Sequence, residues 1–403
     1  MSGQPTPQLS VVVPVRDDAA RLRRCLDALN ASDADPATFE IVVVDDASRS
    51  PDSAAVAEAA GARVIRLSEN VGPAVARNRG AAEARGDIVW FVDADCLAHA
   101  DAMGRVLATL APGTPHDATF GSYGPDPGSP ALISRWKNLA HRHTHQIARP
   151  EASTFWSGCG AMRREVFLKF GGFDETYGRP CIEDVELGMR LAAAGGRIML
   201  DHDLQVEHLK RWRWGGLIRT DIFDRGVPWT RVLLAAARDG GASVPDLNVG
   251  PSQKIAALAA AALVGLFLVA GVFDPWLWLV PVVAVLGTLL LDALTDRGVG
   301  WRWLTPIVFA GWIGSAAFVG WRSPIVLLIG VALVGAIVVL NRRQYGMMAK
   351  LGGVGFAIAG FVPHVAYYGC ALAGYAIGVV SHLVRPRPAP AAPTAAAAGR
   401  AGT

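Results

Sequence analysis

The sequence is poor in charge for its length. Charged residues make up 18% of the 403 residues and hydrophobic residues 52%, whereas ordinary soluble domains are about a quarter charged. This composition excludes a chain that is disordered over most of its length, and it excludes a protein that is soluble throughout. The net charge of +3 is too small to indicate a nucleic-acid partner, and we expect none.

Acidic residues are nearly absent from the C-terminal part of the chain. After Gln253 there are only Asp274, Asp292 and Asp296 and no glutamate, although ten of the 38 lysines and arginines lie there. The chain therefore divides into a charged N-terminal part, large enough for a sizeable core, and an apolar C-terminal part.

Paired cysteines are also missing. The five cysteines are scattered, without a CxxC motif or a spacing typical of metal sites: Cys25, Cys96, Cys159, Cys181 and Cys370. This pattern favours reduced thiols in a cytosolic compartment over a disulfide framework. No apolar stretch typical of a signal peptide follows Met1, so we expect that the N-terminal part is not secreted.

Long apolar runs fill the C-terminal part. They lie at residues 255–273, 276–294, 303–321, 324–340 and 351–383. Their length is that of membrane-spanning helices, and the last run leaves open one tilted helix or two short ones. We predict an all-α transmembrane domain of about four to six helices over 254–384 in a phospholipid bilayer. A disordered tail rich in proline and alanine is expected over 385–403.

The basic residues near these runs predict an orientation. The loops after the second and fourth runs hold Arg297, Arg302, Arg342, Arg343 and Lys350, whereas the other two hold only Arg322. Because positive loops stay on the cytoplasmic side, we expect a multi-pass protein of the cytoplasmic (inner) membrane. The N-terminal part then faces the cytoplasm.

The N-terminal part alternates strand and helix patterns. Strand patterns lie at 9–15, 40–44, 63–67 and 88–92, with helical patterns at 19–30, 54–60 and 72–84. This alternation predicts an α/β fold with a mainly parallel sheet, whose ligands bind beyond the carboxyl ends of the strands. Asp45, Asp46, Asp93 and Asp95 all follow strand patterns directly.

Asp93 and Asp95 form a DxD motif at the end of an apolar strand. Two carboxylates at this spacing can reach one Mg²⁺ or Mn²⁺ ion and the diphosphate that the ion bridges. The alternative is a polar turn that caps the next helix. The four acids at one sheet edge favour the divalent cation.

Several motifs occur in a set order along the N-terminal part. They are VVVPVRDD at 11–18, VVVDDAS at 42–48, ENVGPAVARNRG at 69–80, DIVWFVDAD at 87–95, GGFDE at 171–175 and IEDVELGMRL at 182–191. In order and spacing they resemble family 2 glycosyltransferases of the GT-A fold, over residues 9–212. The resemblance implies a nucleotide-diphosphate sugar as donor and inversion at the anomeric carbon.

The same resemblance implies roles by position. Donor-binding positions would be Pro14, Val15, Asp18, Asp45, Asp46, Arg77, Asn78 and Asp93. Pro14 and Val15 would line the base pocket, and Asp45 would accept a hydrogen bond from the base. Asp95 would hold the metal, and Asp93 would meet the ribose or the metal. Arg16-Asp17-Asp18 stands where Tyr-Asn-Glu is usual, which leaves the nucleotide base open.

Glu183 and Asp184 begin a helical pattern after the GGFDE stretch. Inverting transfer needs a base that takes the proton of the acceptor hydroxyl. Acids in a first helical turn also stabilise the helix dipole, so the location alone does not settle the role. With the resemblance, we predict that Asp184 is the base and that Glu183 is the alternative base or holds the acceptor.

His208 precedes an RW pair. The resemblance implies that His208 is a third metal ligand, and His208-x-x-Arg211-Trp212 is similar to the QxxRW motif of processive synthases. Arg211 would then bind the donor diphosphate and Trp212 would cover the acceptor, near Cys159 and Gly160 on the acceptor side. The alternative is an interfacial belt of basic and aromatic residues over 210–214.

Two further stretches complete the division of the chain. Residues 216–253 are predicted to be an amphipathic interfacial segment with Trp229 as an anchor, after a cytoplasmic glycosyltransferase domain at 1–215. The alternating histidines His141, His143 and His145 favour a solvated helix face or an acceptor-side loop over a zinc site.

The predicted acceptor is a hydroxyl of a membrane lipid or a lipid-linked saccharide. An ionised polyprenyl phosphate would need no base, so the Glu183-Asp184 pair opposes a polyprenyl-phosphate sugar synthase. A processive polysaccharide synthase is opposed by the incomplete QxxRW motif. A non-enzymatic scaffold or transporter subunit with a degenerate nucleotide-sugar domain is opposed by the presence of Asp95 and Asp184.

Overall fold

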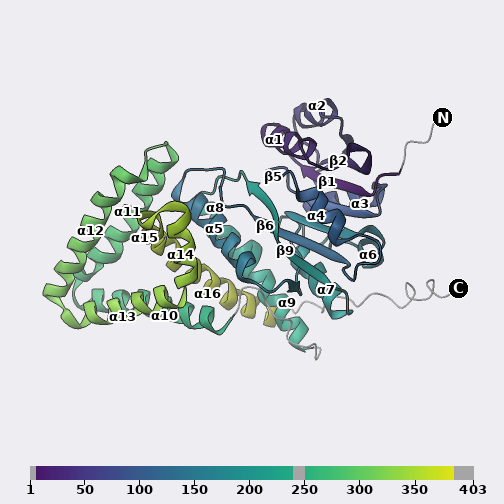
Figure 1. Ribbon diagram of the computed structural model, residues 1–403. Coiled ribbons are helices and arrows are strands. Elements are labelled where there is room, and N and C mark those ends of the chain that lie inside the picture. The colour runs from purple at the N-terminus through teal and green to yellow at the C-terminus, as the bar shows by residue number, and fades with distance from the viewer. Residues whose placement is uncertain (1–5, 239–249, 385–403) are drawn as a thin grey trace.

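The computed structural model describes residues 6–238 and 250–384. The tail predicted to be disordered, 385–403, lies outside the described residues. Figure 1 shows an α/β domain built from the N-terminal part and, beside it, a group of long helices from the C-terminal part. This arrangement agrees with the predicted fold class.

The first half of the sheet is parallel. Its strands run in the order β3-β2-β1-β4. They are β1 (Leu9–Val15), β2 (Phe39–Asp45), β3 (Arg63–Arg66) and β4 (Ile88–Val92), joined through α1 (Ala19–Asn30), η1 (Pro36–Thr38), α2 (Asp52–Ala59) and α3 (Pro73–Glu83). Strands β1, β2 and β4 are almost entirely buried, because helices cover both sheet faces.

The second half of the sheet mixes both strand directions. It contains β5 (Cys96–Ala98), β6 (Ala118–Tyr123), β7 (Glu151–Ala152), β8 (Cys159–Arg163) and β9 (Ile198–His208). β8 runs antiparallel between β4 and β6, whereas β6 and β9 are parallel. Val92 is paired with Cys159, so the chain that enters β8 lies beside the DxD turn that leaves β4.

Four more helices belong to this domain: α4 (Ala102–Thr109), α5 (Leu132–Ile147), α6 (Arg164–Lys169) and α7 (Glu183–Ala193). Helix α5 contacts β6 and β9 on one side and the C-terminal helices on the other, and in Figure 1 it lies between the two regions. Helix α7 packs so closely on the backbone before β8 that a Cβ at Gly188 would lie 2.2 Å from the Phe155 nitrogen.

This contact predicts an asymmetry between two helical glycines. Gly188→Ala is expected to lower the free energy of unfolding by about 2 kcal/mol, because α7 must shift away from the sheet. Gly104→Ala in α4, where a Cβ meets nothing within 4 Å, is expected to raise it by about 0.5–1 kcal/mol. Denaturant unfolding of the purified chain, followed by tryptophan fluorescence, measures both; equal stability of the two variants would contradict the packing argument.

The described residues of the C-terminal region form helices joined by short connections. It contains α8 (Trp214–Arg219), the π-helical turn η2 (Thr220–Gly226), α9 (Val227–Arg238), α10 (Pro251–Phe273), η3 (Pro275–Trp278), α11 (Leu279–Asp296), α12 (Trp301–Arg322), α13 (Pro324–Leu340), α14 (Arg342–Gly352), α15 (Val354–Ala359) and α16 (Phe361–Val384). The predicted interfacial segment 216–253 is helical up to residue 238, and its part from 239 to 249 lies outside the described residues.

Several of these helices are long and apolar enough to cross a membrane. Within the described residues there are four by length and composition, or up to five if α13 and α14, which are bent by 78°, form one span. The run at 351–383, which the sequence left open, is the short α15 followed by the long α16. The number agrees with the predicted range.

Candidate active site

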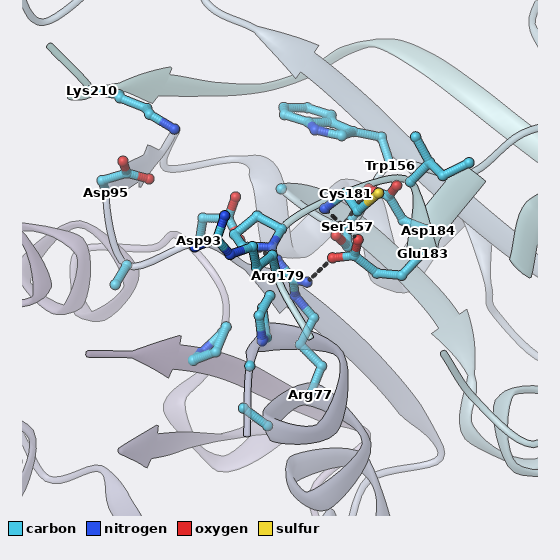
Figure 2. A pocket seen from close by; sticks show the side chains of 18 of the residues that line it. Arg77, Asp93, Asp95, Trp156, Ser157, Arg179, Cys181, Glu183, Asp184 and Lys210 are labelled. Carbon is cyan, nitrogen blue, oxygen red and sulfur yellow. Dashed lines mark hydrogen bonds and ion pairs between the residues drawn. The ribbon is translucent and has the colours of Figure 1, made fainter. Parts of the chain in front are cut away.

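A cavity of about 630 Å³ opens beyond the carboxyl ends of β1 and β4. Most of the predicted site residues line it: Pro14, Val15, Asp18, Asp46, Arg77, Asp93, Asp95, Glu183, Asp184, His208 and Trp212. Figure 2 shows Asp95 on one side of the cavity, Asp184 on the other, and Asp93 between them. The sheet edge, the start of α7 and the end of β9 thus meet at one cavity.

Four predicted residues take part in the fold beside the cavity and do not line it. Asp45 accepts a hydrogen bond from the Ser48 nitrogen at 2.9 Å and closes the turn after β2. Asn78 holds Phe173 through both its amide oxygen and nitrogen, at 2.9 and 2.8 Å. Cys159 and Gly160 pair within the sheet, where the Cys159 side chain has no exposed surface.

Arg211 also lies away from the cavity. Its guanidinium, half exposed, forms an ion pair with Asp296 at the end of α11. The side chain that the RW motif assigns to the donor diphosphate thus joins the α/β domain to the C-terminal helices. Trp212, next in the chain, does line the cavity.

Arg77 is a buried cation between two carboxylates. Its guanidinium contacts Asp93 at 2.6 Å and Glu183 at 2.9 Å, and only 5% of the residue is exposed. Burial opposes the charged form, but the negative charges of Asp93 and Glu183 outweigh it and raise the pKa of Arg77. The contacts fix the DxD turn relative to the first turn of α7.

Removal of this cation is predicted to destabilise the domain. Arg77→Leu leaves Glu183 buried and unpaired, so we expect the free energy of unfolding to fall by about 3–5 kcal/mol. Arg79→Leu, at an exposed position of the same helix, is expected to change it by less than about 0.5 kcal/mol. Denaturant unfolding measures both; a loss at Arg77 no larger than at Arg79 would contradict the assigned role.

Asp184 is held by three hydrogen bonds. Its Oδ2 accepts from the nitrogen and the hydroxyl of Ser157, at 2.9 and 3.0 Å, and its Oδ1 accepts from the Val185 nitrogen at 2.8 Å. Burial raises the pKa of Asp184, and these hydrogen bonds oppose the rise. A carboxylate that is oriented, at the cavity wall and with a raised pKa can accept a proton from a bound hydroxyl.

Glu183 is more completely engaged than Asp184. One oxygen accepts from Arg77 and the other from the Cys181 nitrogen at 2.8 Å, and 3% of the residue is exposed. Burial and the neighbouring Asp184 raise the pKa of Glu183. Because both oxygens have strong donors, Glu183 is better placed to orient Arg77 than to take a proton.

Asp95 and His208 face one another. The His208 Nε2 lies 3.5 Å from an Asp95 oxygen, and these atoms and the Cys96 sulfur lie within 4.8 Å of one another. Burial opposes ionisation of Asp95. The hydrogen bond and the charge of a protonated His208 outweigh burial and lower the pKa of Asp95. A carboxylate oxygen and an imidazole nitrogen that converge fit a divalent cation such as Mn²⁺ or Mg²⁺. Asp93 is outside this group.

Several residues of the cavity lie outside every motif found in the sequence. Trp156, Ser157 and Arg179 line it without belonging to any motif. The sequence left Lys210 open as part of an interfacial belt. In Figure 2 its side chain lies near Asp95, and its Nζ lies 4.2 Å from the centre of the Trp212 ring. Burial lowers the pKa of Lys210.

The sequence favoured a solvated face for the alternating histidines, but the structure does not place them on one. His141 and His145 line the cavity, and His143 is buried on another side of α5. The rings of His141 and His145 contact Trp156 at 5.1 and 5.2 Å between centres. The solvated-face prediction was wrong because α5 is covered on both sides, by the sheet and by the C-terminal helices.

The segment that precedes the first candidate span also reaches the cavity. Arg225 of η2 and Trp229 of α9 line it, and Gly226 packs against Gly374 of α16, where a Cβ on either glycine would come within about 3 Å of the other's backbone. One wall of the cavity is therefore built on the helices of the C-terminal region.

Part of this chain is similar to known glycosyltransferases. Residues 10–171 match the sequence profile described as Glycosyl transferase family 2. The chain is 26% identical over 234 residues to an O-antigen biosynthesis protein of Myxococcus xanthus, covering 50% of this chain and 17% of that protein. It is 28% identical over 220 residues to a pre-mycofactocin glycosyltransferase of Mycobacterium tuberculosis, covering 51% and 44%.

A further relative and one solved structure are similar. The relative is a validoxylamine A glucosyltransferase of Streptomyces hygroscopicus, 30% identical over 220 residues, covering 47% of this chain and 49% of that protein. The chain thus spans half or less of these relatives' length. The structure is a mannosyltransferase from Pyrobaculum calidifontis in complex with GDP-Man and Mn²⁺, 17% identical with a TM-score of 0.48, covering 89% of this chain and 87% of that chain.

Proposed function

We propose that this chain, whose residues 10–171 match the profile of family 2 glycosyltransferases, is a membrane-anchored inverting glycosyltransferase. It transfers a sugar from a nucleotide-diphosphate donor to a hydroxyl of a membrane lipid or of a lipid-linked saccharide. The observation that carries the proposal is a single cavity with a metal-type pair at one side, Asp95 and His208, and an oriented carboxylate, Asp184, at the other.

The acceptor is proposed from the walls of the cavity. Arg225 and Trp229 line it and belong to the helices just before the first candidate span. Trp229 offers an apolar body and a polar N–H, which suits the boundary between a membrane and water. A lipid whose chains stay in the membrane can therefore place its polar head in the cavity without leaving the bilayer.

The residues support a direct displacement. The acceptor oxygen attacks the anomeric carbon, its proton passes to Asp184, and the bond from that carbon to the diphosphate oxygen breaks. A divalent cation at Asp95 and His208 would stabilise the charge of the leaving diphosphate. Lys210, near Asp95 (Figure 2), adds a positive charge on the same side, and Arg77 keeps Asp93 and Glu183 in place.

The orientation in the membrane is proposed from two ion pairs. Asp274, in the turn after α10, pairs with Arg322 at the end of α12 at 2.6 Å, so these two helix ends lie together. Helix α11 begins near that turn and ends at Asp296. Asp296 pairs with Arg211 of the α/β domain. The basic loops are then on the side of the α/β domain, which the positive-inside rule places in the cytoplasm.

The test uses membranes that contain the full chain, a panel of nucleotide sugars, Mg²⁺ or Mn²⁺, and a lipid extract. Release of a nucleoside diphosphate is recorded and the lipid fraction is analysed by mass spectrometry. A lipid heavier by one sugar is the expected result. A long polymer would overturn the proposal in favour of a processive synthase, and no release with any donor would overturn it in favour of a non-enzymatic role.

A further inference from the structure

His208 has a partner on the side of its ring that faces away from Asp95. Its Nδ1 lies 2.7 Å from the amide oxygen of Asn138, and both residues are buried. An amide oxygen only accepts hydrogen bonds, so in this contact the Nδ1–H of His208 donates to Asn138. When the ring is neutral, as it must be to bind a cation, its lone pair is then on Nε2, the nitrogen that faces Asp95.

Asn138 makes this contact at the expense of its other amide group. Its Nδ2 is buried and has no hydrogen-bond partner within the described residues. A buried donor without a partner costs about 1–3 kcal/mol. For packing alone, an apolar side chain of the same size would serve this position better, so the contact with His208 is what the polar side chain of Asn138 supplies here.

Asn138 lies on helix α5, which holds the end of β9 at a second point. The Ser134 hydroxyl accepts from the Trp212 nitrogen at 2.8 Å. Asn138 and Ser134, four residues apart, lie on one face of the helix and contact the two ends of the segment 208–212. The position of α5 therefore decides where His208, Lys210 and Trp212 lie.

The first turn of α5 is capped from the C-terminal region. The residue before the helix, Ala131, makes no side-chain cap. Instead, the Leu132 nitrogen donates to the Thr295 hydroxyl at 3.1 Å, and the Ile133 nitrogen donates to Asp292 at 2.9 Å. A first helical turn needs such acceptors, and here both come from α11, a candidate membrane span.

The other side of α5 is also tied to the C-terminal region. Lys137, next to Asn138, contacts both oxygens of Asp221 in η2 at 2.7 Å, and the pair is buried. Helix α5 is thus fixed from α11 at its start and from η2 in its middle, while it contacts His208 and Trp212 with its remaining face.

We propose that Asn138 is a positioning residue that fixes His208 as an Nε2 metal ligand, and that the span α11 keeps it there by capping α5. The inference rests on the proposed function only in its use of a divalent cation at Asp95 and His208. Partners that orient a metal-binding histidine typically change metal affinity by about 10–100-fold when they are removed.

The experiment measures Mn²⁺ binding to the full chain in detergent by electron paramagnetic resonance, without donor or acceptor. Asn138→Leu is expected to raise the Kd for Mn²⁺ by about 10–100-fold. Asn138→Asp keeps an oxygen that accepts from Nδ1 and is expected to stay within about threefold of the parent chain. Asp292→Ala, which removes one acceptor from the α5 cap, is expected to raise the Kd by about threefold to tenfold.

Gln146→Leu is the matched control. Gln146 is on the same helix and donates to the His202 carbonyl at 2.7 Å, away from His208, so its loss is expected to leave the Kd unchanged. The inference is overturned if Asn138→Leu binds Mn²⁺ like the parent chain, or if Asn138→Asp is as weak as Asn138→Leu. A parent chain that transfers sugar but binds no Mn²⁺ overturns the inference and leaves transfer itself intact.

Discussion

Asp95→Asn is expected to lower sugar transfer by about a thousandfold, the effect typical of a lost electrostatic partner of a leaving group. The substitution keeps the size of the side chain and removes its charge. Asp95 faces His208 with 3.5 Å between oxygen and nitrogen, so the amide would weaken the pair that is proposed to hold the cation. Release of nucleoside diphosphate, recorded against Mn²⁺ concentration, measures the loss.

A control separates this loss from a general change of charge. Asp203→Asn removes a carboxylate whose side chain is 74% exposed, on the same β9 strand as His208 but outside the cavity lining. It is expected to keep full activity. Full activity of Asp95→Asn over the whole range of Mn²⁺ concentrations would refute the assignment of Asp95 to the metal.

The strand edge of the site could be predicted from local sequence. Buried β-branched runs followed by acids indicate parallel strands, and parallel strands bring their carboxyl ends to one edge. Asp46, Asp93 and Asp95 accordingly line the cavity. The pattern could not separate Asp46 from its neighbour Asp45. The Asp46 side chain accepts from the Val71 and Gly72 nitrogens, whereas the Asp45 side chain accepts from the Ser48 nitrogen in the turn after β2. Which neighbour faces a cavity depends on the turn that follows.

The walls of the site could not be predicted, because they depend on contacts between distant segments. Asn138 reaches His208 across 70 residues of chain, and no periodicity reports such a pair. For Arg211, a motif was present and predicted a diphosphate ligand. In the structure Arg211 pairs with Asp296, 85 residues away. That pairing exists only because α11 docks on the α/β domain.

Asp184→Asn is expected to lower the rate of transfer by about 100- to 10,000-fold, while the donor remains bound. An amide has nearly the same shape as the carboxylate, but it cannot take the proton of an acceptor hydroxyl. Donor binding is measured by titration with the nucleotide sugar, and turnover by diphosphate release. Loss of donor affinity would make Asp184 a binding residue. Unchanged turnover would indicate an acceptor that is already ionised, such as a lipid phosphate.

The pH dependence tests the same residue with the fold intact. A base works only when it is deprotonated, and burial raises the pKa of Asp184 above the ordinary value of 3.8. The rate should therefore fall as the pH is lowered through that raised pKa. Ser157→Ala removes the hydroxyl that donates to Oδ2 at 3.0 Å, which stabilises the charged form, so the acid limb should move to still higher pH. Because the Ser157 nitrogen still holds Oδ2, the rate above that limb should change little. An acid limb that stays in place would show that the titrating group is not Asp184.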